Sequence, residues 1–435
     1  MIPDRRTLYS YLALAVFVAL VGFWQGPANL TLLIAHTLAY ALIALGLNIQ
    51  FGYGGLSNFG VMGFLMVGGA TGVFFSCPVI PEFWTSDGPF LLVRAFAALG
   101  LGALLVFGAH RLDRIGIKGK LRLAAIVLAW FIGYVLYRSQ LDPAAAYIES
   151  TTGWIGGLGL YPVFGWLMAG IVVAFIGRFV AKITLGLRAD YLGIATIGIS
   201  EILRSFVKNM DWLTRGTLAV SPVPWPVPIP QDLQAVGVSI DDSFVYARLG
   251  FILLLLVFFV LAFFFINRAY GGPWGRMMRA IRENHIAAEA MGKDVRGRQL
   301  ELFMLGAALM GMGGAMLVTF SQILDPSGYQ PINHTFLIWV MVIVGGAGNN
   351  WGAVLGAVLI YFVWILSDSM AQLVFVNISN WTESFGWGAI PEIDSRALQM
   401  RVFVLGLVIS IALRYAPKGL IPEVISHHFD PKTKA

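Results

Sequence analysis

The sequence predicts an all-α polytopic membrane protein with glycine-rich broken segments, and three observations support this fold class. Hydrophobic residues make up 58% of the 435 residues, and charged residues make up 12%, about half the share usual in soluble domains. The mean hydropathy is +0.78. The chain has room for about 10–12 transmembrane helices of ~20 residues with their loops. These values exclude a soluble globular enzyme and a disordered chain.

Long stretches without Asp, Glu, Lys or Arg mark the transmembrane spans. They include residues 58–75, 249–266 and 302–324. Allowing ~20 residues per crossing, we expect spans at residues 8–24, 30–49, 58–76, 90–109, 121–138, 158–177, 190–207, 247–267, 299–321, 333–346, 351–368 and 398–414.

Two glycine-rich segments interrupt this pattern. Residues 331–367 carry none of these four residue types, yet one helix of that length would reach roughly 55 Å and overshoot a ~30 Å hydrocarbon core. The run GGAGNN at 345–350 predicts this break, which is the second in the chain, and GYGGLSNFGVMG at 52–63 predicts the first. Each contains Asn-aromatic-Gly, which fits an internal repeat of the kind that transporter folds keep, but small-residue helix packing is the better explanation for the glycines as a class.

Basic residues decide the orientation. With a cytoplasmic N-terminus, 21 of the 29 Lys and Arg residues fall in the N-terminus, 110–122, 178–189, 268–298 and the C-terminal tail. The positive-inside rule therefore places both termini in the cytoplasm. The first hydrophobic segment lacks a small-residue cleavage site and is expected to be an uncleaved span.

Common catalytic and nucleotide-binding motifs are absent from the sequence. The sequence has no P-loop, no H-E-x-x-H and no G-x-S-x-G, so neither nucleotide hydrolysis nor common hydrolase chemistry is indicated. The single cysteine, Cys77, excludes an internal disulfide and a Cys-based zinc site. We therefore expect no catalytic residue, no metal site and no enzymatic activity in this chain.

The cytoplasmic segment 271–298 has a pattern of its own. Pro273 after two glycines predicts a helix start, and Arg276, Arg279 and Arg282 recur as one basic stripe. Asn284 is expected to cap a second short helix that Gly292 ends. This short helix presents a face of small side chains. It fits either an anionic membrane surface or a groove on a cytoplasmic partner, and the residues alone do not decide between these two locations.

With its neighbours in the chain, this segment resembles a known family. GRMMRAIRENHIAAEAMGKDV is similar to the coupling loop of LivM-like permease subunits of branched-chain (hydrophobic) amino acid ABC importers. Four further stretches resemble that family in the same order: ALGLNIQFGYGGLSNFGVMGF at 44–64, LRADYLGIATIGISEILRSFVKNMDWLT at 187–214, INHTFLIWVMVIVGGAGNNWGAVLGAVL at 332–359 and YAPKGLIPE at 415–423. The chain departs from the pattern at 77–160, which adds two spans, and at the long loop 369–397.

The resemblance implies an ABC-importer permease architecture in a multi-pass protein of the bacterial inner (plasma) membrane. Residues 1–435 then form one transmembrane domain, with periplasmic loops at 208–246 and 369–397 and the coupling loop at 268–298. Implied partners are a second related permease subunit, two cytoplasmic ATPase subunits and a periplasmic substrate-binding protein, with no nucleic acid. ATP and Mg²⁺ belong to the ATPase subunits, and this chain needs no cofactor. The implied ATPase-coupling residues are Arg279, Arg282, Glu283, Asn284, Ile286, Ala287, Ala288, Glu289, Ala290, Met291 and Gly292.

Polar residues inside the predicted spans are candidates for the transport pathway. They are Asn48, Gln50, Asn58, Glu201, Arg204, Asn349 and Asn350. The amides lie at helix breaks, where they either line the pathway or satisfy broken backbone groups. Glu201 and Arg204 either meet a zwitterionic substrate or neutralise each other three residues apart on one helix. His36 is expected to be a packing residue.

A different function class remains open from the residues: a stand-alone ion-coupled secondary transporter or channel for a small polar solute. It would need acidic groups inside the bilayer, and only Glu201, Asp190 and Asp368 qualify. Within the ABC architecture, the substrate is either a hydrophobic amino acid or urea and short amides.

Overall fold

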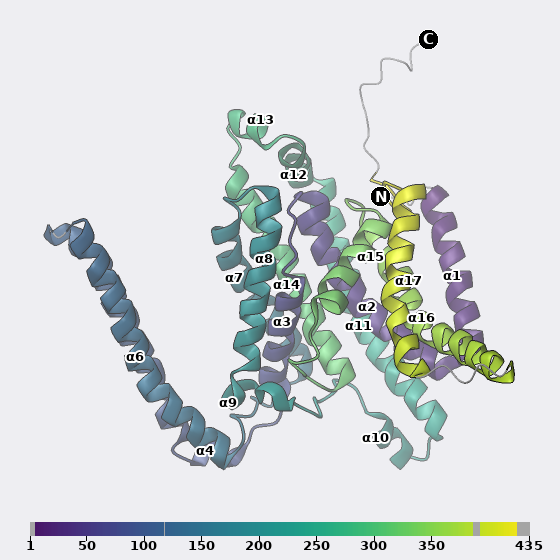
Figure 1. The fold of residues 1–435 in the computed structure, drawn as a ribbon, viewed down its shortest axis with the longest axis horizontal. Coiled ribbons are helices and arrows are strands. Elements are labelled where there is room, and N and C mark those ends of the chain that lie inside the picture. Colours follow the sequence, from purple (N-terminus) through teal and green to yellow (C-terminus); the bar gives the residue numbers. More distant parts are fainter. Residues whose placement is uncertain (1–4, 117, 386–391, 424–435) are drawn as a thin grey trace, which may run out of the picture.

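The computed structural model describes residues 5–116, 118–385 and 392–423, and these are almost entirely helical (Figure 1). The helices that correspond to the twelve expected spans are α1 (Arg5–Gln25), α2 (Pro27–Leu47), α3 (Val61–Ser76), α5 (Gly88–His110), α6 (Lys120–Thr151), α7 (Pro162–Thr184), α8 (Ala189–Lys208), α11 (Ile240–Gly271), α14 (Val295–Ser321), α15 (Leu337–Gly345), α16 (Asn350–Ser384) and α17 (Ile393–Tyr415). Among the described residues, eight of these segments are long and apolar enough to cross a membrane. The polytopic all-α fold is therefore confirmed.

Short helices connect the spans. They are α4 (Pro81–Thr85), η2 (Leu112–Ile115), α9 (Asp211–Thr214), η3 (Gly216–Leu218), α10 (Pro230–Ala235), α12 (Pro273–Glu283) and α13 (His285–Ala290). In Figure 1, α12 and α13 lie at the same end as the start of α1 and the end of α17, whereas α4, α9 and α10 lie at the opposite end. The segments that the charge pattern places together thus share one end of the molecule.

The core is built where α14 packs against α2 and α3, the helices on either side of the break at residues 52–63. A Cβ on Gly68 of α3 would lie 2.1 Å from the carbonyl oxygen of Gly311 in α14, and one on Gly46 of α2 would lie 2.7 Å from that of Gly306. These helices therefore pack backbone to backbone, which only small residues allow and which is typical of membrane helix interfaces.

Both expected breaks are present. Helix α2 continues into the π-helix η1 (Asn48–Tyr53), and the chain is not helical again until α3 begins at Val61. The π-helix η4 (Ile332–Phe336) leads into α15, which ends at Gly345. Gly346 and Gly348 then adopt φ of +123° and +85° before α16 begins, a conformation that favours glycine.

Three expected boundaries were wrong. Helix α16 continues to Ser384, so residues 369–384 are helical and not loop. This stretch has no glycine or proline to end the helix. Its polar side chains are compatible with a helix that continues beyond the membrane. Helix α6 extends to Thr151 rather than 138 and continues through Pro143, which lies inside the helix. The segment 208–246 contains α9, η3, α10 and the first turns of α11.

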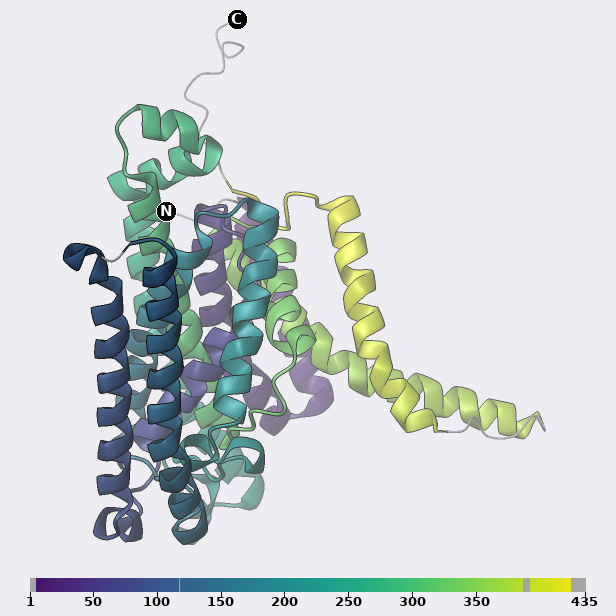
Figure 2. The same ribbon diagram turned by 60° about the vertical axis from the view of Figure 1, so that its left-hand side comes forward.

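The added spans α5 and α6 lie side by side as a hairpin (Figure 2), and this hairpin stands apart from the bundle in Figure 1. The two helices approach most closely where Gly102 faces Gly133. A small apolar cluster attaches the hairpin to the rest of the chain at the end opposite α12 and α13, where Phe83 and Ile148 pack with Trp212 of α9. The extra length at 77–160 thus builds a separate helical arm.

Candidate functional site

The segment between α11 and α14 forms the expected pair of short helices. Gly272 and Pro273 start α12, and the side chain of Asn284 accepts a hydrogen bond from the backbone N–H of Ala287 at 3.0 Å. This bond caps α13, and Gly292 follows that helix with φ of +77°. Local capping chemistry therefore produces the hairpin that the sequence predicted; we call α12 and α13 the coupling hairpin.

The faces of α13 differ from the expectation of one small docking face. Ala288 is buried in a cluster with Met278, Ile281 and Val295, whereas Ala287 is exposed. Ile286 and Met291 are 69% and 80% exposed. The surface available to a partner is therefore an apolar face, and Ala288 serves the hairpin's own packing.

The expected basic stripe on α12 is divided in the structure. Arg276 is exposed, but the guanidinium group of Arg279 lies 5.0 Å from the ring centroid of Tyr270. Arg282 forms an ion pair with Glu423 at 2.6 Å and donates to the backbone carbonyl of Gly52. Two of the three arginines thus turn inward and do not present a basic surface to lipid.

Glu423 belongs to a C-terminal segment, residues 416–423, that contacts the second glycine break. The N–H groups of Leu420 and Ile421 donate to the carbonyls of Val344 and Gly345, both at 2.9 Å. The amide of Asn349 donates to the carbonyl of Pro422 at 3.1 Å. Because Glu423 also binds Arg282, this segment joins the coupling hairpin to the second break, and Arg282 itself reaches the first.

The amides predicted as pathway candidates are engaged in hydrogen bonds at these breaks. Asn48 donates to the Oδ1 of Asn350 at 3.0 Å and accepts from the N–H of Gly348 at 2.8 Å. Asn350 in turn donates to Asn267 of α11 at 2.7 Å. This network ties the first break to the second, and Asn48 and Asn350 are 0% and 2% exposed.

A second pair of amides secures the first break. Gln50 donates to the carbonyl of Phe303 at 2.8 Å and accepts from Asn58 at 2.7 Å. The Oδ1 of Asn58 accepts from the N–H of Gly60, and both Gln50 and Asn58 are fully buried. These amides therefore satisfy backbone N–H groups at the breaks, those of Gly60 and Gly348, and their role in lining the pathway stays a prediction.

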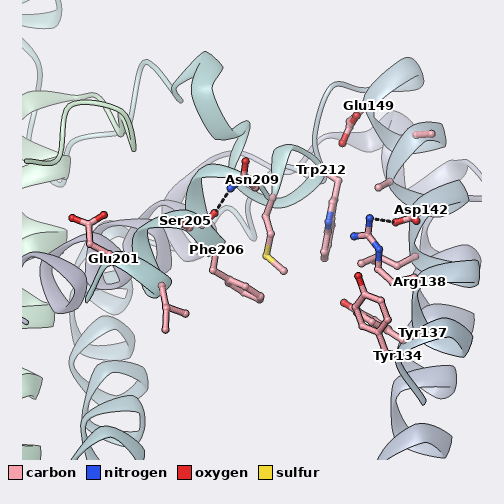
Figure 3. Close-up of a pocket in the computed structure, with 15 residues that line it drawn as sticks. Tyr134, Tyr137, Arg138, Asp142, Glu149, Glu201, Ser205, Phe206, Asn209 and Trp212 are labelled. Carbon is pink, nitrogen blue, oxygen red and sulfur yellow. Dashed lines mark hydrogen bonds and ion pairs between the residues drawn. The ribbon is translucent and has the colours of Figure 1, made fainter. Parts of the chain in front are cut away.

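Glu201 and Arg204 form the expected pair on α8, with a Nη1–Oε2 distance of 3.3 Å. Glu201 borders a groove of about 800 Å³ between α6 and α8. Figure 3 shows that its carboxylate is turned away from Arg138, Tyr134 and Tyr137 on the α6 side. The pair is half exposed at the surface of α8, which fits mutual neutralisation on one helix.

One group of polar residues escaped the sequence reasoning. His36, which was expected to be a packing residue, stacks on Tyr361 and borders a cavity with Tyr40, Asp325 and His334. These residues come from α2, α16, η4 and the segment before η4, so no local motif brings them together. The run DPSGYQPINH at 325–334 was the available signal, because it carries several polar groups at the end of an apolar span.

Fold and site together define a class of protein. A polytopic bundle has two broken segments; one bonds directly to a capped helical hairpin outside the bundle, and the other is joined to that hairpin through residues 416–423. This is the construction of a membrane transport subunit. The residues that the structure describes hold no cluster of metal-binding side chains.

Comparison with known proteins identifies the family. Residues 90–413 match the family described as branched-chain amino acid transport system / permease component, and the chain belongs to this family. It is therefore a transport subunit and not an enzyme. The chain is 24% identical over 390 residues to the probable branched-chain amino acid transport permease protein LivM of Methanocaldococcus jannaschii, covering 88% of this chain and 90% of that protein.

Two bacterial relatives are similar over a shorter stretch. The high-affinity branched-chain amino acid transport system permease protein LivM of Escherichia coli is 27% identical over 282 residues, which cover 62% of this chain and 60% of that protein. The protein of the same name from Salmonella typhimurium is 28% identical over 282 residues, which again cover 62% of this chain and 60% of that protein. No solved structure matches the chain.

Proposed function

We propose that this chain is one permease subunit of an ATP-driven importer for branched-chain or other hydrophobic amino acids, located in the bacterial inner membrane. A second related permease subunit completes the channel, two cytoplasmic ATPase subunits bind ATP and Mg²⁺, and a periplasmic binding protein delivers the substrate. Both termini and the coupling hairpin face the cytoplasm. The names of the relatives support the substrate class.

The contact between the coupling hairpin and both glycine breaks carries this proposal. Arg282 of α12 binds Gly52 at the first break and Glu423 of the segment that holds the second. Ile286 and Met291 on α13 remain exposed at the far side of the hairpin. A push on α13 therefore reaches the first break through Arg282 and the second through Glu423 and its segment, and no chemistry is required of this chain.

The mechanism is alternating access. ATP binding to the ATPase subunits changes the surface that contacts α13, and a partner can shift the equilibrium between inward-open and outward-open states only by contacting them differently. The breaks are where the helices α2, α15 and α16 can change direction without losing a regular hydrogen-bond ladder, since their backbone groups already bond to side chains.

Substitution of Ala287 tests the proposal. In proteoliposomes that contain all the subunits, Ala287→Trp should lower ATP-driven uptake of L-leucine roughly ten- to hundredfold, because overpacking a contact typically costs about 1–3 kcal/mol. ATP hydrolysis stimulated by loaded binding protein should be lost as well. Ala269→Trp, at an exposed position near the end of α11, is the matched control and should retain uptake.

A membrane-surface role for α13 makes the reverse prediction. A tryptophan would then anchor the helix at the interface and leave transport intact or improved. Normal uptake by a well-expressed Ala287→Trp protein would therefore overturn the coupling role. If the wild-type complex takes up urea and not L-leucine, the proposed architecture stands and the proposed substrate is wrong.

A further inference from the structure

A cavity of about 270 Å³ opens where α2, α14 and α16 meet the segment between α14 and η4. Ser321, at the end of α14, lies on its rim, and the other end of α14 follows the coupling hairpin. The cavity is therefore at the opposite end of α14 from that hairpin, on the periplasmic side in the proposed orientation. Its volume is at the small end of the range for small-molecule sites.

Aromatic rings form two walls of this cavity. On one wall Tyr361 stacks against Tyr40 with ring centroids 4.9 Å apart, and against His36 at 5.8 Å. On the other wall Tyr329 packs on His334 at 4.7 Å. Within the described residues, no hydrogen bond joins the hydroxyl groups of Tyr40 and Tyr361 to a protein group, so both can donate to a ligand in the cavity, whereas the hydroxyl of Tyr329 lies beside Gly69 of α3.

Asp325 supplies the only carboxylate of the lining, which contains no Lys or Arg. Its Oδ1 accepts the N–H of Ser327 at 2.8 Å, and no basic side chain pairs with it in the part of the chain that the structure describes. An unpaired carboxylate among aromatic rings attracts a ligand ammonium group, which ring faces also favour.

The rest of the lining is apolar. Leu317 and Val318 of α14 and Ile323 just beyond it complete the cavity. An aliphatic side chain placed against them would leave water, with a gain of roughly 25 cal/mol per Å² of buried apolar surface. The cavity thus presents an anionic group, free hydroxyl donors and an apolar patch within one small volume.

We propose that this cavity is a substrate subsite for a small aliphatic amino acid, with the ammonium group at Asp325, the carboxylate at the tyrosine hydroxyls and the side chain against Leu317, Val318 and Ile323. This inference rests on the proposed importer function and adds a site to it. The carboxylate of Asp325 together with the tyrosine hydroxyl donors selects a zwitterion over a simple amine or acid.

The walls of the subsite also lead to the coupling end. Helix α2 carries Tyr40 and continues into the first break at Asn48, and α16 carries Tyr361 and begins at Asn350 of the second break. A ligand that draws the walls together therefore acts on the helices that the coupling hairpin moves.

Asp325→Asn is a conservative test, because its amide oxygen can still accept the N–H of Ser327. The complete transporter is reconstituted, and uptake of L-leucine is measured with saturating loaded binding protein. Asp325→Asn should lower uptake at least tenfold, while basal ATP hydrolysis and the thermal midpoint of unfolding stay at wild-type values. Asp241→Asn, at an exposed carboxylate in the first turn of α11, is the control and should transport normally. Asp325→Glu, which keeps the charge, should recover part of the uptake.

The outcomes separate this inference from the proposed function. Wild-type complexes that do not transport L-leucine would contradict the importer assignment, whereas wild-type transport with Asp325→Asn within twofold of it would contradict the subsite alone. If Asp325→Asn does not accumulate in the membrane, Tyr361→Phe replaces it, because this change keeps the stacked ring and removes only the hydroxyl. Uptake of L-leucine by Tyr361→Phe should fall at least threefold, and uptake within twofold of wild type would contradict the subsite.

Discussion

At the scale of single residues, Arg282 connects more parts of this protein than any local pattern would indicate. Its guanidinium group reaches Glu423, 141 positions away, and the carbonyl of Gly52, 230 positions away. The Glu423 carboxylate also accepts from the hydroxyl of Tyr270 at 2.9 Å. The side chains of Arg282 and Glu423 are 21% and 13% exposed, so the pair is shielded from water and from much of the salt screening.

Removal of one partner of this pair should destabilise the protein. Arg282→Gln leaves the Glu423 carboxylate largely buried without its counter-charge, and we expect a loss of about 2–4 kcal/mol. Arg276→Gln, on the same helix but exposed, should change stability by less than about 0.5 kcal/mol. Thermal unfolding in detergent measures both, and equal midpoints for the two variants would contradict the connecting role of Arg282.

Cys77 provides a residue-scale prediction from its ionisation. It lies directly after α3 and is 2% exposed, and burial raises the pKa of its thiol to about 11. Because the reactive thiolate forms only as the pH approaches the pKa, labelling at pH 7 should be at least tenfold slower than at a cysteine placed at exposed Val236.

The check is a time course of maleimide labelling in purified protein, repeated after unfolding. Labelling of Cys77 should reach the rate of the Val236→Cys control only in the unfolded chain. Equal rates in the folded protein would show that the thiol is accessible.

At the scale of elements, the glycine breaks depend on close approach rather than on flexibility alone. A Cβ on Gly52 would lie 2.2 Å from the Oδ1 of Asn48 and 2.4 Å from the backbone nitrogen of Gly348. The first break therefore touches the second directly, and any side chain at Gly52 displaces the network that Asn48 makes with Asn350.

Two glycine substitutions should thus have opposite effects. Gly52→Ala should destabilise the protein by about 1–3 kcal/mol through overpacking and impair transport. Gly100→Ala, in mid-α5 with open space around it, should be neutral or stabilising by about 0.5–1 kcal/mol, because alanine is the better helix former. Unfolding midpoints and L-leucine uptake test the pair; full uptake by Gly52→Ala would show that the breaks need not touch.

At the scale of the whole molecule, the segments rich in basic residues lie at one end of the helical bundle. The coupling hairpin shares its end with the start of α1 and the end of α17 (Figure 1), and the opposite end carries α9 and α10. An asymmetric basic content of this kind sets orientation in the membrane.

Labelling from outside the cell tests this orientation. Single cysteines at Lys118 and His285 should be protected from an impermeant reagent, and cysteines at Val236 and Glu383 should react. Val236 replaces the nearby Trp225 for this purpose, since the Trp225 ring stacks on Phe320. Reaction at position 285 in intact cells would reverse the topology.

Much of the molecule follows from local sequence. Hydrophobic runs determined the spans, because each must cross ~30 Å of hydrocarbon. Glycine runs determined the breaks, and Pro273, Asn284 and Gly292 determined the two helices of the hairpin, since capping acts between residues a few positions apart. Helix lengths were less accurate where polar stretches such as 369–384 continue a helix beyond the apolar span.

Only the tertiary structure decided what the polar residues do. In sequence, the amides at 48, 50, 58, 349 and 350 fit either a pathway or the pairing of backbone groups at the breaks, and only the structure shows their partners, which lie up to 302 positions away. The sequence predicts Arg282 as one member of a basic stripe and Ala288 as a docking residue. In the structure Arg282 pairs with Glu423, and Ala288 is buried. Asp325 and Tyr361 meet only because α2, α14 and α16 pack together. Long-range contacts of this kind depend on how helices dock, and side-chain spacing along the chain does not contain that information.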